Sequence, residues 1–320
     1  MDKQEILPLM SNTLKDIDVS SLGLKNISHY KGKVRDVLTL QDDKLLIITS
    51  DRISAFDKVL TTIPCKGEVL NRISLFWFNQ LKDIIPNHII KQTSSRSVLT
   101  RKYKVLPIEV IVRGYLTGSA WRDYEKGNPV SGIKLKEGMK FNEKFQEPII
   151  TPSTKESDGS HDVPISCKEI VKKGIVPEEI WAKVENTAKK LFMRGTEILK
   201  KQGLILVDTK YEFGVKDNNI FLIDEVHTPD SSRFWYEDTY EELFKQGEKQ
   251  RKLDKEYLRQ WLISNNFMGD GPIPHIPDDV RAEVAFRYIK AYELITGSEF
   301  VPMSNGAEEE AETIAKSLQK

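Results

Sequence analysis

Three charged side chains alternate along one apolar stretch of the chain, GLILVDTKYEFGVKDNNIFLIDEV. The stretch reads as two strands joined by a turn at KDNN, because Asp and Asn tolerate tight-turn geometry. Side chains alternate between the two faces of a strand, so Asp208, Lys210 and Glu212 are expected to share one face. If the turn centres on Asn218, Glu212 lies directly opposite Asp224 on the second strand.

Two carboxylates opposed across neighbouring strands repel each other unless a cation lies between them. A divalent ion with oxygen ligands suits such a position, and Mg²⁺ held by one or two carboxylates and by phosphate oxygens fits best. The alternative is a solvated sheet edge whose acids are neutralised by Lys210 and Arg233. The hairpin residues by themselves leave both interpretations open.

Two further segments carry residues that suit a bound anion. In YKGKVRD, Gly32 stands between two lysines and Arg35 follows, so backbone N–H groups and cations can approach a phosphate. An ordinary cationic turn is the alternative. VRGYLTGS supplies Arg113 and Ser119 around two glycines, either as an anion pocket or as a helix start. The chain has neither a P-loop pattern nor G-x-G-x-x-G, so a nucleotide site of those types is not indicated.

The elements that must position these residues are strand-rich segments and a few long helices, which predicts a mixed α+β protein. Asp42-Asp43 suits a hairpin turn. In SDRISAFD, a strand exit, Ser50 or Asp51 is expected to cap the next turn. Residues 125–165 read as polar loops with short strands. Helices are expected within 67–85 before Pro86, from Pro177 to Gly203, and within 277–297, the last capped by Asp and ended by Gly297.

The composition excludes several classes of protein. The 320 residues include 48 basic and 48 acidic side chains, so there is no basic field to attract nucleic acid. No apolar run approaches the roughly 20 residues that a membrane span needs. The first residues lack the pattern of a secretion signal, and Cys65 and Cys167 have no metal-like or disulfide-framework spacing. A cytoplasmic protein is expected.

The motifs together resemble one family, the phosphoribosylaminoimidazole-succinocarboxamide synthases, or SAICAR synthetases. The matching phrases are YKGKVRD, SDRISAFD, IPCKGEVLNRISLFWF, IEVIVRGYLTGSAW, ITPSTKESDGSHD, LVDTKYEFG and IDEVHTPDSSRFW, in the order of the family. The tail through RYIKAYELITG is similar to the longer, yeast-like branch. Between Asp224 and Arg233 the chain has EVHTPDSS, which is one residue longer than the shorter bacterial form.

This resemblance implies an ATP-dependent ligase that joins the carboxylate of carboxyaminoimidazole ribotide (CAIR) to the amine of L-aspartate through an acyl phosphate. It implies two mixed α/β domains with an ATP cleft between them and C-terminal helices. We expect a strand-rich domain at 1–108, an ATP and substrate domain at 109–250 and a helical segment at 251–320. The small-molecule substrates CAIR, L-aspartate and ATP are the expected partners, and a monomer is favoured over a dimer.

The resemblance also implies roles for single residues. Glu212 and Asp224 match the metal-binding carboxylates, and His227 reads as a local hydrogen-bonding residue. Two aspartates, Asp208 and Asp162, are candidates for the base that deprotonates the amine. Residues that match the ATP site are Gly32, Lys33, Val34, Arg35, Glu109, Val110 and Val112, with Glu212 and Asp224. Those that match the ribotide site are Ser54, Arg113, Ser119, Asp230, Ser232 and Arg233, and those near the reacting groups are Asp208, Lys210, Lys155 and Asp162.

Two other functions remain open at this level. A small-molecule kinase would use the same nucleotide site with a hydroxyl acceptor and would not need aspartate. A non-enzymatic module would bind Mg-ATP without substrate-dependent release of ADP.

Overall fold

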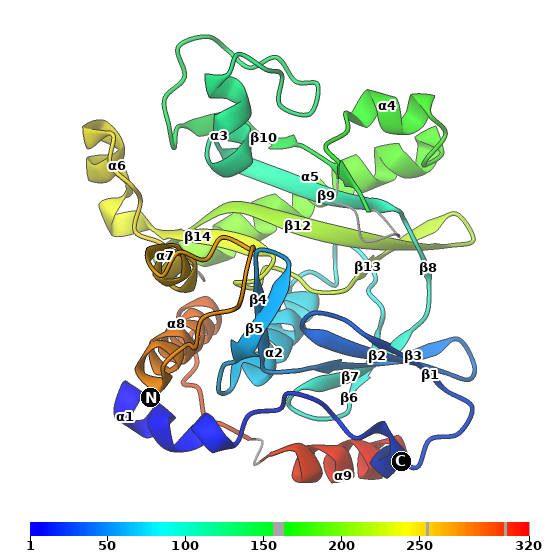
Figure 1. Cartoon of the computed structure of the whole chain (residues 1–320). Coiled ribbons are helices and arrows are strands. Elements are labelled where there is room, and N and C mark those ends of the chain that lie inside the picture. Colours follow the sequence, from blue (N-terminus) through cyan, green and yellow to red (C-terminus); the bar gives the residue numbers. More distant parts are fainter. Residues whose placement is uncertain (156–162, 254–255, 304–305, 320) are drawn as a thin grey trace. The chain divides into compact units, whose positions relative to one another are not determined.

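The computed structural model describes residues 1–155, 163–253, 256–303 and 306–319. Antiparallel sheets and helices alternate along the chain, as Figure 1 shows. Of the expected site residues, Lys155 is among the described residues, whereas Asp162 lies outside them. No helix in the described ranges is long and apolar enough to cross a membrane.

The chain divides into two compact units, and each of them combines an antiparallel sheet with helices. This is the α+β class that the sequence predicts. The separate roles expected for 1–108, 109–250 and 251–320 stay a prediction. Unit 1 contains Met1–Phe76, His88–Lys102 and Asp254–Lys320, and unit 2 contains Trp77–Asn87 and Tyr103–Leu253.

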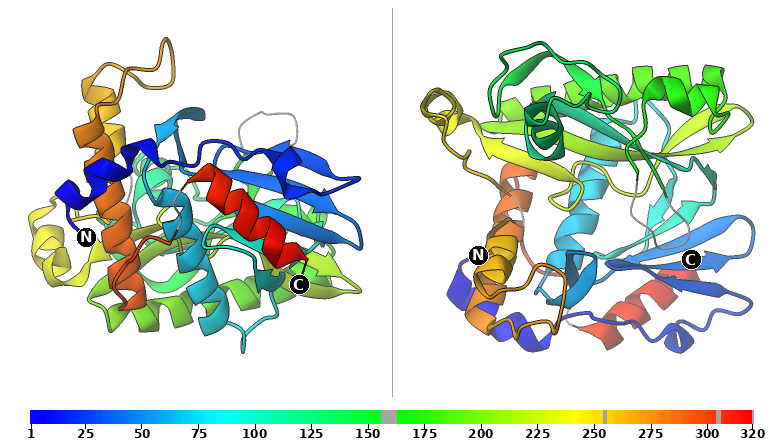
Figure 2. Two further views of the ribbon diagram at one scale, coloured as in Figure 1. Left: turned by 90° about the horizontal axis from the view of Figure 1, so that it is seen from below. Right: turned by 45° about the horizontal axis from the view of Figure 1, so that its top comes forward.

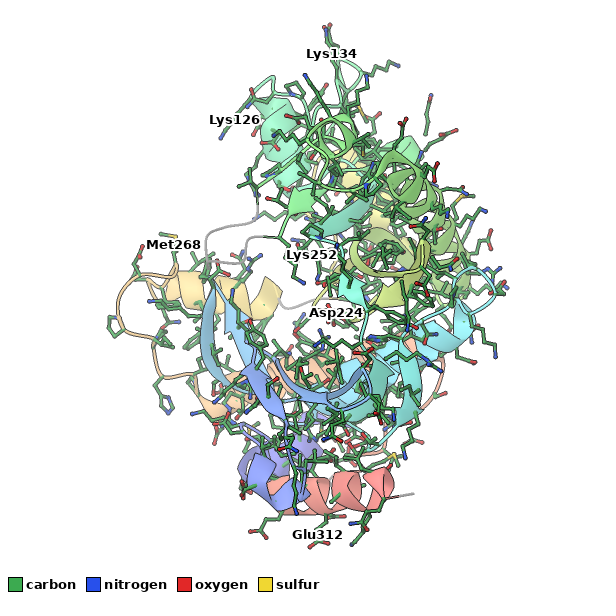
Figure 3. All side chains as sticks on the ribbon, turned by 90° about the vertical axis from the view of Figure 1, so that its right-hand side faces the viewer. Lys126, Lys134, Asp224, Lys252, Met268 and Glu312 are labelled. Atoms are coloured by element: carbon green, nitrogen blue, oxygen red, sulfur yellow. The ribbon has the colours of Figure 1, made fainter. Side chains whose placement is uncertain are left out.

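Unit 1 is built on a five-stranded sheet in the order β1-β2-β3-β7-β6. Leu38, Leu46 and Ile48 point to one face, where helix α9 and the N-terminal segment cover them, with Ile314 of α9 fully buried. Figure 2 shows α9 lying across this sheet, and Figure 3 shows Glu312 on its outer side. The bounds are β1 Ser28–Lys31, β2 Arg35–Leu40, β3 Lys44–Thr49, β6 Ile89–Gln92, β7 Ser97–Arg101 and α9 Ala307–Leu318.

The other elements of unit 1 agree with one expected cap and correct another. Ser50 Oγ accepts the backbone N–H of Arg52 at 3.3 Å, which agrees with the expected cap by Ser50 or Asp51, whereas Asp51 Oδ1 accepts the backbone N–H of Gly67 at the start of α2. Helix α8 has Pro277 at its N-cap, so the expected cap by Asp is wrong. Asp278 and Asp279 lie inside the first turn, where their negative charges interact favourably with the positive end of the helix dipole. The bounds are α1 Lys3–Ile6, η1 Leu7–Ser11, η2 Val19–Leu22, β4 Arg52–Ala55, β5 Lys58–Thr62, α2 Lys66–Gln80, α7 Glu256–Ser264 and α8 Asp278–Thr296.

Unit 2 is built around strand β12, which pairs with four other strands. Helix α5 covers one face of this sheet (Figure 2) and is the helix expected between Pro177 and Gly203. Lys126 and Lys134 mark the loop that projects beyond α3 (Figure 3). The bounds are β8 Lys104–Val105, β9 Ile108–Tyr115, α3 Gly118–Glu125, β10 Lys144–Ile150, β11 Ser153–Thr154, α4 Cys167–Lys172, α5 Glu178–Lys200, β12 Leu204–Lys216, β13 Asn219–Ile223, β14 Ser232–Tyr236 and α6 Glu237–Gln246.

Candidate active site

The hairpin of β12 and β13 has a register different from the expected one. Lys216 pairs with Asn219, so the turn centres between Asp217 and Asn218 and places Ile223, not Asp224, opposite Glu212. Both turn residues have positive φ angles, +50° and +59°, as a tight two-residue turn requires. The expected direct opposition of Glu212 and Asp224 is therefore wrong by one residue.

Asp224 nevertheless reaches the same charged cluster as Glu212. It follows the last residue of β13 and has φ +66°, a left-handed conformation that Asp adopts more readily than most residues. This conformation ends the regular alternation of faces at the strand end. Both carboxylates consequently approach the ammonium of Lys210, at 2.5 Å for Glu212 and 3.5 Å for Asp224.

Lys210 is the centre of this carboxylate cluster. A third acid, Glu109 of β9, lies 3.4 Å from the Lys210 Nζ atom, and Lys155 binds the other oxygen of Glu212 at 2.6 Å. Burial by itself lowers the pKa of Lys210, but Glu212, Asp224 and Glu109 outweigh it and hold the pKa well above its ordinary value. Lys210 therefore remains a cation, and three carboxylates from β9, β12 and the end of β13 converge on it.

A row of three charged residues crosses the sheet beside this cluster. Asp208 of β12 is paired with Arg113 of β9 on one side and with Arg233 of β14 on the other. Side chains directly opposite each other on paired strands stand about 5 Å apart on one face. Arg113 Nη1 donates to Asp208 Oδ2 at 3.2 Å, Arg233 Nε donates to Oδ1 at 2.9 Å, and Arg233 Nη2 also donates to Oδ2. We call this row the arginine clamp.

Further contacts fix the two guanidinium groups of the clamp. Arg113 Nε donates to Thr151 Oγ1 at 2.8 Å and Nη2 donates to Ser119 Oγ at 3.0 Å. A Cβ atom at Gly118, where φ is +62°, would lie 2.2 Å from Arg233 Nη1, so a side chain there would displace this guanidinium and strain the backbone. Burial lowers the pKa of Arg113 and Asp208 opposes that effect. A second negative charge, such as that of a bound anion, would further stabilise this buried cation.

The two faces of β12 separate the charged residues from the apolar ones. Asp208, Lys210 and Glu212 share one face, as the sequence predicts. Val112 and Val110 of β9 are paired with Thr209 and Tyr211, and these positions belong to the other face. Only the backbone of Val110 and Val112 is therefore placed to meet a ligand on the charged face.

The segment between Asp224 and Arg233 is held by contacts with β12 and by contacts of its own. Lys210 N donates to Ser231 O at 3.0 Å, and Thr228 Oγ1 donates to Glu225 Oε2 at 2.5 Å. The hydroxyls of Ser232 and Thr209 are 2.7 Å apart. Ser232 thus faces the same way as Thr209, away from the arginine clamp. Among the expected ribotide ligands, the structure brings Arg113, Ser119 and Arg233 together but not the Ser232 side chain.

His227 is buried beneath the carboxylate hairpin. Its Nε2 atom lies 2.5 Å from the Tyr211 hydroxyl, and its ring meets Trp77 edge-on, with centroids 4.6 Å apart. A Cβ atom at Gly195 of α5 would lie 2.4 Å from the His227 ring, so glycine permits this close approach. Burial lowers the pKa of His227 to about 3. The expectation of a local hydrogen-bonding histidine is confirmed, and Phe234 and Trp235 are buried as packing residues.

This buried histidine should make stability depend on pH. His227 titrates near pH 6.5 in the unfolded chain and near 3 in the folded one, so between these values the unfolded state binds more protons. Stability therefore falls as pH decreases from 6.5 towards 3. Relative to pH 7, the loss at pH 4.5 amounts to roughly 2–3 kcal/mol. Urea unfolding at pH 7 and 4.5 should show this loss in the wild type and not in His227→Phe.

The exposed His275 provides the control for that measurement. His275→Gln should keep the wild-type difference in unfolding free energy between the two pH values. An unchanged difference in His227→Phe would contradict the assignment of acid sensitivity to His227.

The loop of residues 32–35 in unit 1 has its carbonyl groups turned inward. Arg52 donates to the carbonyls of Gly32 at 3.1 Å and Lys33 at 3.3 Å, and Ser50 donates to that of Val34 through its N–H at 2.9 Å and its hydroxyl at 2.6 Å. The Gly32 N–H donates to Arg35 O at 2.8 Å. Among the hydrogen bonds of the described residues, none has the amide of Lys33 or Val34 as its donor.

Two other expected residues lie in unit 1. Lys33 extends its side chain to Asp57, with Nζ 2.5 Å from Oδ1, and both side chains are exposed. Ser54 is partly buried on β4. Arg52 was not singled out in the sequence analysis. Its place at the start of a strand, next to the apolar Ile53, is a signal that could have indicated a buried cation. Thr151 was also missed, and its hydroxyl gives no such signal.

Comparisons with known proteins agree with this fold. The sequence matches the SAICAR synthetase family over residues 28–272. It is 48% identical over 279 residues to the phosphoribosylaminoimidazole-succinocarboxamide synthase of Azobacteroides pseudotrichonymphae, covering 86% of each chain. It is 44% identical over 311 residues to that of Bacteroides thetaiotaomicron, covering 96% of each chain.

Solved structures agree as well. SAICAR synthase from Saccharomyces cerevisiae, complexed with SAICAR, aligns with a TM-score of 0.80 at 35% identity, over 91% of this chain and all of that one. A SAICAR synthetase in complex with ADP aligns with a TM-score of 0.65 at 27% identity, over 86% of this chain and all of that one.

The fold, the site and these matches define an ATP-dependent ligase of purine biosynthesis. The chain belongs to the SAICAR synthetase family. Its reaction joins the carboxylate of CAIR to the amine of L-aspartate with the use of ATP. The small-molecule kinase and the non-enzymatic nucleotide-binding module are thereby set aside.

Proposed function

We propose that the charged face of β12 carries out this ligation through an acyl phosphate of CAIR. The supporting observation is that the arginine clamp at Asp208 and the carboxylate cluster at Lys210 and Glu212 occupy alternate positions of one strand. Alternate residues on a strand are about 7 Å apart. A ribotide held by the clamp therefore presents its carboxylate next to a phosphoryl group held at the cluster.

The proposed order of events follows from the chemistry of a carboxylate. A carboxylate is a poor acceptor for an amine because oxide would have to leave. Transfer of the γ-phosphoryl group of ATP to a carboxylate oxygen releases ADP and gives an acyl phosphate. The aspartate amine then attacks the carbonyl carbon, the carbon–oxygen bond to phosphate breaks, and inorganic phosphate leaves with that oxygen. Phosphoryl transfer asks the protein mainly for positioning and charge neutralisation.

Glu212 and Asp224 fit a Mg²⁺ ion. Both present carboxylate oxygens to one cationic group, and such hard donors are the ligands that Mg²⁺ prefers. Within the described residues, no group of three or more acidic, histidine or cysteine side chains is arranged so that it could hold a metal ion. Two carboxylates agree with that observation, because Mg²⁺ takes its other ligands from phosphate oxygens and water. When bound, the ion would neutralise charge on the phosphates.

The cations around the cluster have complementary roles in this proposal. Lys210 and Lys155, which bind the two oxygens of Glu212, balance the charge of the γ-phosphoryl group as it moves. The amides of Lys33 and Val34 and the side chain of Arg35 bind the ATP phosphates in unit 1. The backbone of Glu109–Val112 contacts the adenine.

Substrate binding is assigned to the clamp and its neighbours. Arg113 and Arg233 offer planar donor forks to the anionic groups of CAIR, and Ser119 lies within hydrogen-bond reach of Arg113. For Ser54 and Asp230, ribotide binding stays a proposal that rests on the resemblance to the family. A cytoplasmic monomer, favoured over a dimer, stays a prediction from the sequence.

Asp208 is better suited to orienting the clamp than to accepting a proton. Both of its oxygens accept hydrogen bonds from guanidinium groups. A proton on this carboxylate would compete with those charge-assisted bonds. We therefore assign Asp208 to the orientation of Arg113 and Arg233. Of the two candidate bases, this leaves Asp162, which lies outside the described residues.

An oxygen-labelling experiment tests the proposed order. CAIR labelled with ¹⁸O in its carboxylate should deliver one labelled oxygen to inorganic phosphate per turnover, because the broken carbon–oxygen bond leaves that oxygen on phosphorus. Mass spectrometry of the phosphate measures the transfer. Unlabelled phosphate together with fully labelled SAICAR would show that the carboxylate is never phosphorylated.

A further inference from the structure

Arg52 is a buried arginine of unit 1 whose donors are all engaged. Its side chain is 2% exposed. Nε donates to Lys33 O, Nη1 to Lys15 O and Asp16 Oδ1, and Nη2 to Gly32 O and Asp36 Oδ2. A guanidinium has five N–H donors in a fixed fork, and here each has an acceptor. The ammonium of a lysine has three donors and could not reproduce this set.

The contacts of Arg52 determine which way the 32–35 loop presents its backbone. The carbonyls of Gly32 and Lys33 are held by Arg52, and that of Val34 is held by Ser50. Ser50 and Arg52 are also joined to each other, because the backbone N–H of Arg52 donates to Ser50 Oγ at 3.3 Å. With the carbonyl oxygens held inside, the amides of Lys33 and Val34 are directed outward. Successive outward amides form a concavity that suits an anion.

Asp36 fixes the guanidinium from the opposite side. Its Oδ2 atom accepts from Arg52 Nη2 at 2.8 Å, and its Oδ1 atom lies 2.8 Å from His29 Nε2. Asp36 is almost completely buried. The pair thus joins Arg52, the first residue of β4, to Asp36 of strand β2, which follows the loop.

We propose that Arg52 is a positioning residue that holds the 32–35 loop in its phosphate-binding conformation. The proposal rests on the proposed function, in which this loop binds the phosphates of ATP. Arg52 does not touch the nucleotide. It acts through the carbonyls of Gly32 and Lys33, and Ser50 supports it through that of Val34.

The series ATP, ADP and AMP tests the role of Arg52. In Arg52→Lys the carbonyls of Gly32 and Lys33 lose their hydrogen bonds to the guanidinium, so the loop is no longer held in place. The dissociation constants of ATP and ADP should therefore rise about tenfold or more. That of AMP, which lacks the β- and γ-phosphates, should stay within about twofold. Isothermal titration of each nucleotide in the absence of CAIR gives the three constants. An equal change for all three, or no change for ATP, would overturn the proposal.

Two further variants separate positioning from general stability. Ser50→Ala removes the hydroxyl that donates to Val34 O and accepts the Arg52 N–H, but it keeps the Ser50 N–H contact to Val34 O, so it should show the same pattern with a smaller rise of about threefold for ATP. Arg281→Lys is the matched control, because Arg281 Nε donates to the carbonyl of Thr62 at 2.9 Å, outside the loop. It should leave all three constants unchanged. A rise in Arg281→Lys equal to that in Arg52→Lys would also contradict the proposal.

Amide hydrogen exchange distinguishes this proposal from the one on which it rests. In the wild type, ATP should slow exchange at the amides of Lys33 and Val34, and no effect there would show that the loop does not bind phosphate. If ATP slows exchange equally in the wild type and in Arg52→Lys, the loop assignment holds and the role of Arg52 is wrong. The expected result is protection in the wild type that is largely lost in Arg52→Lys.

Discussion

Asp224→Asn is expected to reduce ADP formation by about 10²–10⁴-fold while the protein stays folded. A bound metal ion stabilises the charge of the transition state by several kcal/mol, and the loss of one anionic ligand weakens the binding of that ion. Asparagine keeps the shape of the side chain and accepts the φ of +66° at this position. Glu212→Gln should behave similarly. Initial rates of ADP formation as a function of Mg²⁺ concentration measure the effect, and Mn²⁺ binding in the presence of ADP reports the site independently of turnover.

The matched control is Asp217→Asn, on the same hairpin. Asp217 is exposed and has φ +50°, so asparagine suits its conformation and removes the same charge away from the cluster. This variant should retain wild-type rates and Mn²⁺ affinity. Near-normal turnover of Asp224→Asn and Glu212→Gln at limiting Mg²⁺ would rule out the metal assignment.

Arg233→Lys is expected to raise the apparent KM for CAIR by about 10–100-fold and to leave that for ATP within about twofold. Lysine keeps the charge but loses the planar fork that binds both oxygens of Asp208. Each lost hydrogen bond to a charged group amounts to about 1.5–3 kcal/mol. Steady-state rates with each substrate varied in turn give the two constants. Arg113→Lys should follow the same pattern, because Arg113 occupies the other side of the clamp.

An exposed ion pair in the same unit provides the comparison. Arg194 binds both oxygens of Asp83, at 3.2 and 3.0 Å, and the two side chains are 36% and 59% exposed. Arg194→Lys removes the same kind of fork but should change neither KM. Equal rises for CAIR and ATP in Arg233→Lys would indicate a general structural role in place of ribotide binding.

Much of unit 2 could be predicted because its signals are local. The alternation of apolar and charged residues predicts that Asp208, Lys210 and Glu212 share a face of β12, and this is confirmed. The helix that follows Pro177 begins with two glutamates in its first turn, as expected. These features depend on residues close in sequence, so steric and electrostatic rules for a single strand or helix are sufficient.

Only the tertiary structure decided how residues distant in sequence share one site. The turn centres between Asp217 and Asn218 and not on Asn218, so Ile223 and not Asp224 is paired with Glu212. The left-handed backbone of Asp224 at the strand end nevertheless places its carboxylate in the cluster. Arg113 and Arg233 meet at Asp208 because three strands pair in one register, which no local pattern fixes. Cross-strand register depends on packing of the whole sheet. The sequence by itself determined the chemistry of the residues and the face of each strand, whereas pairing between strands determined which of them meet.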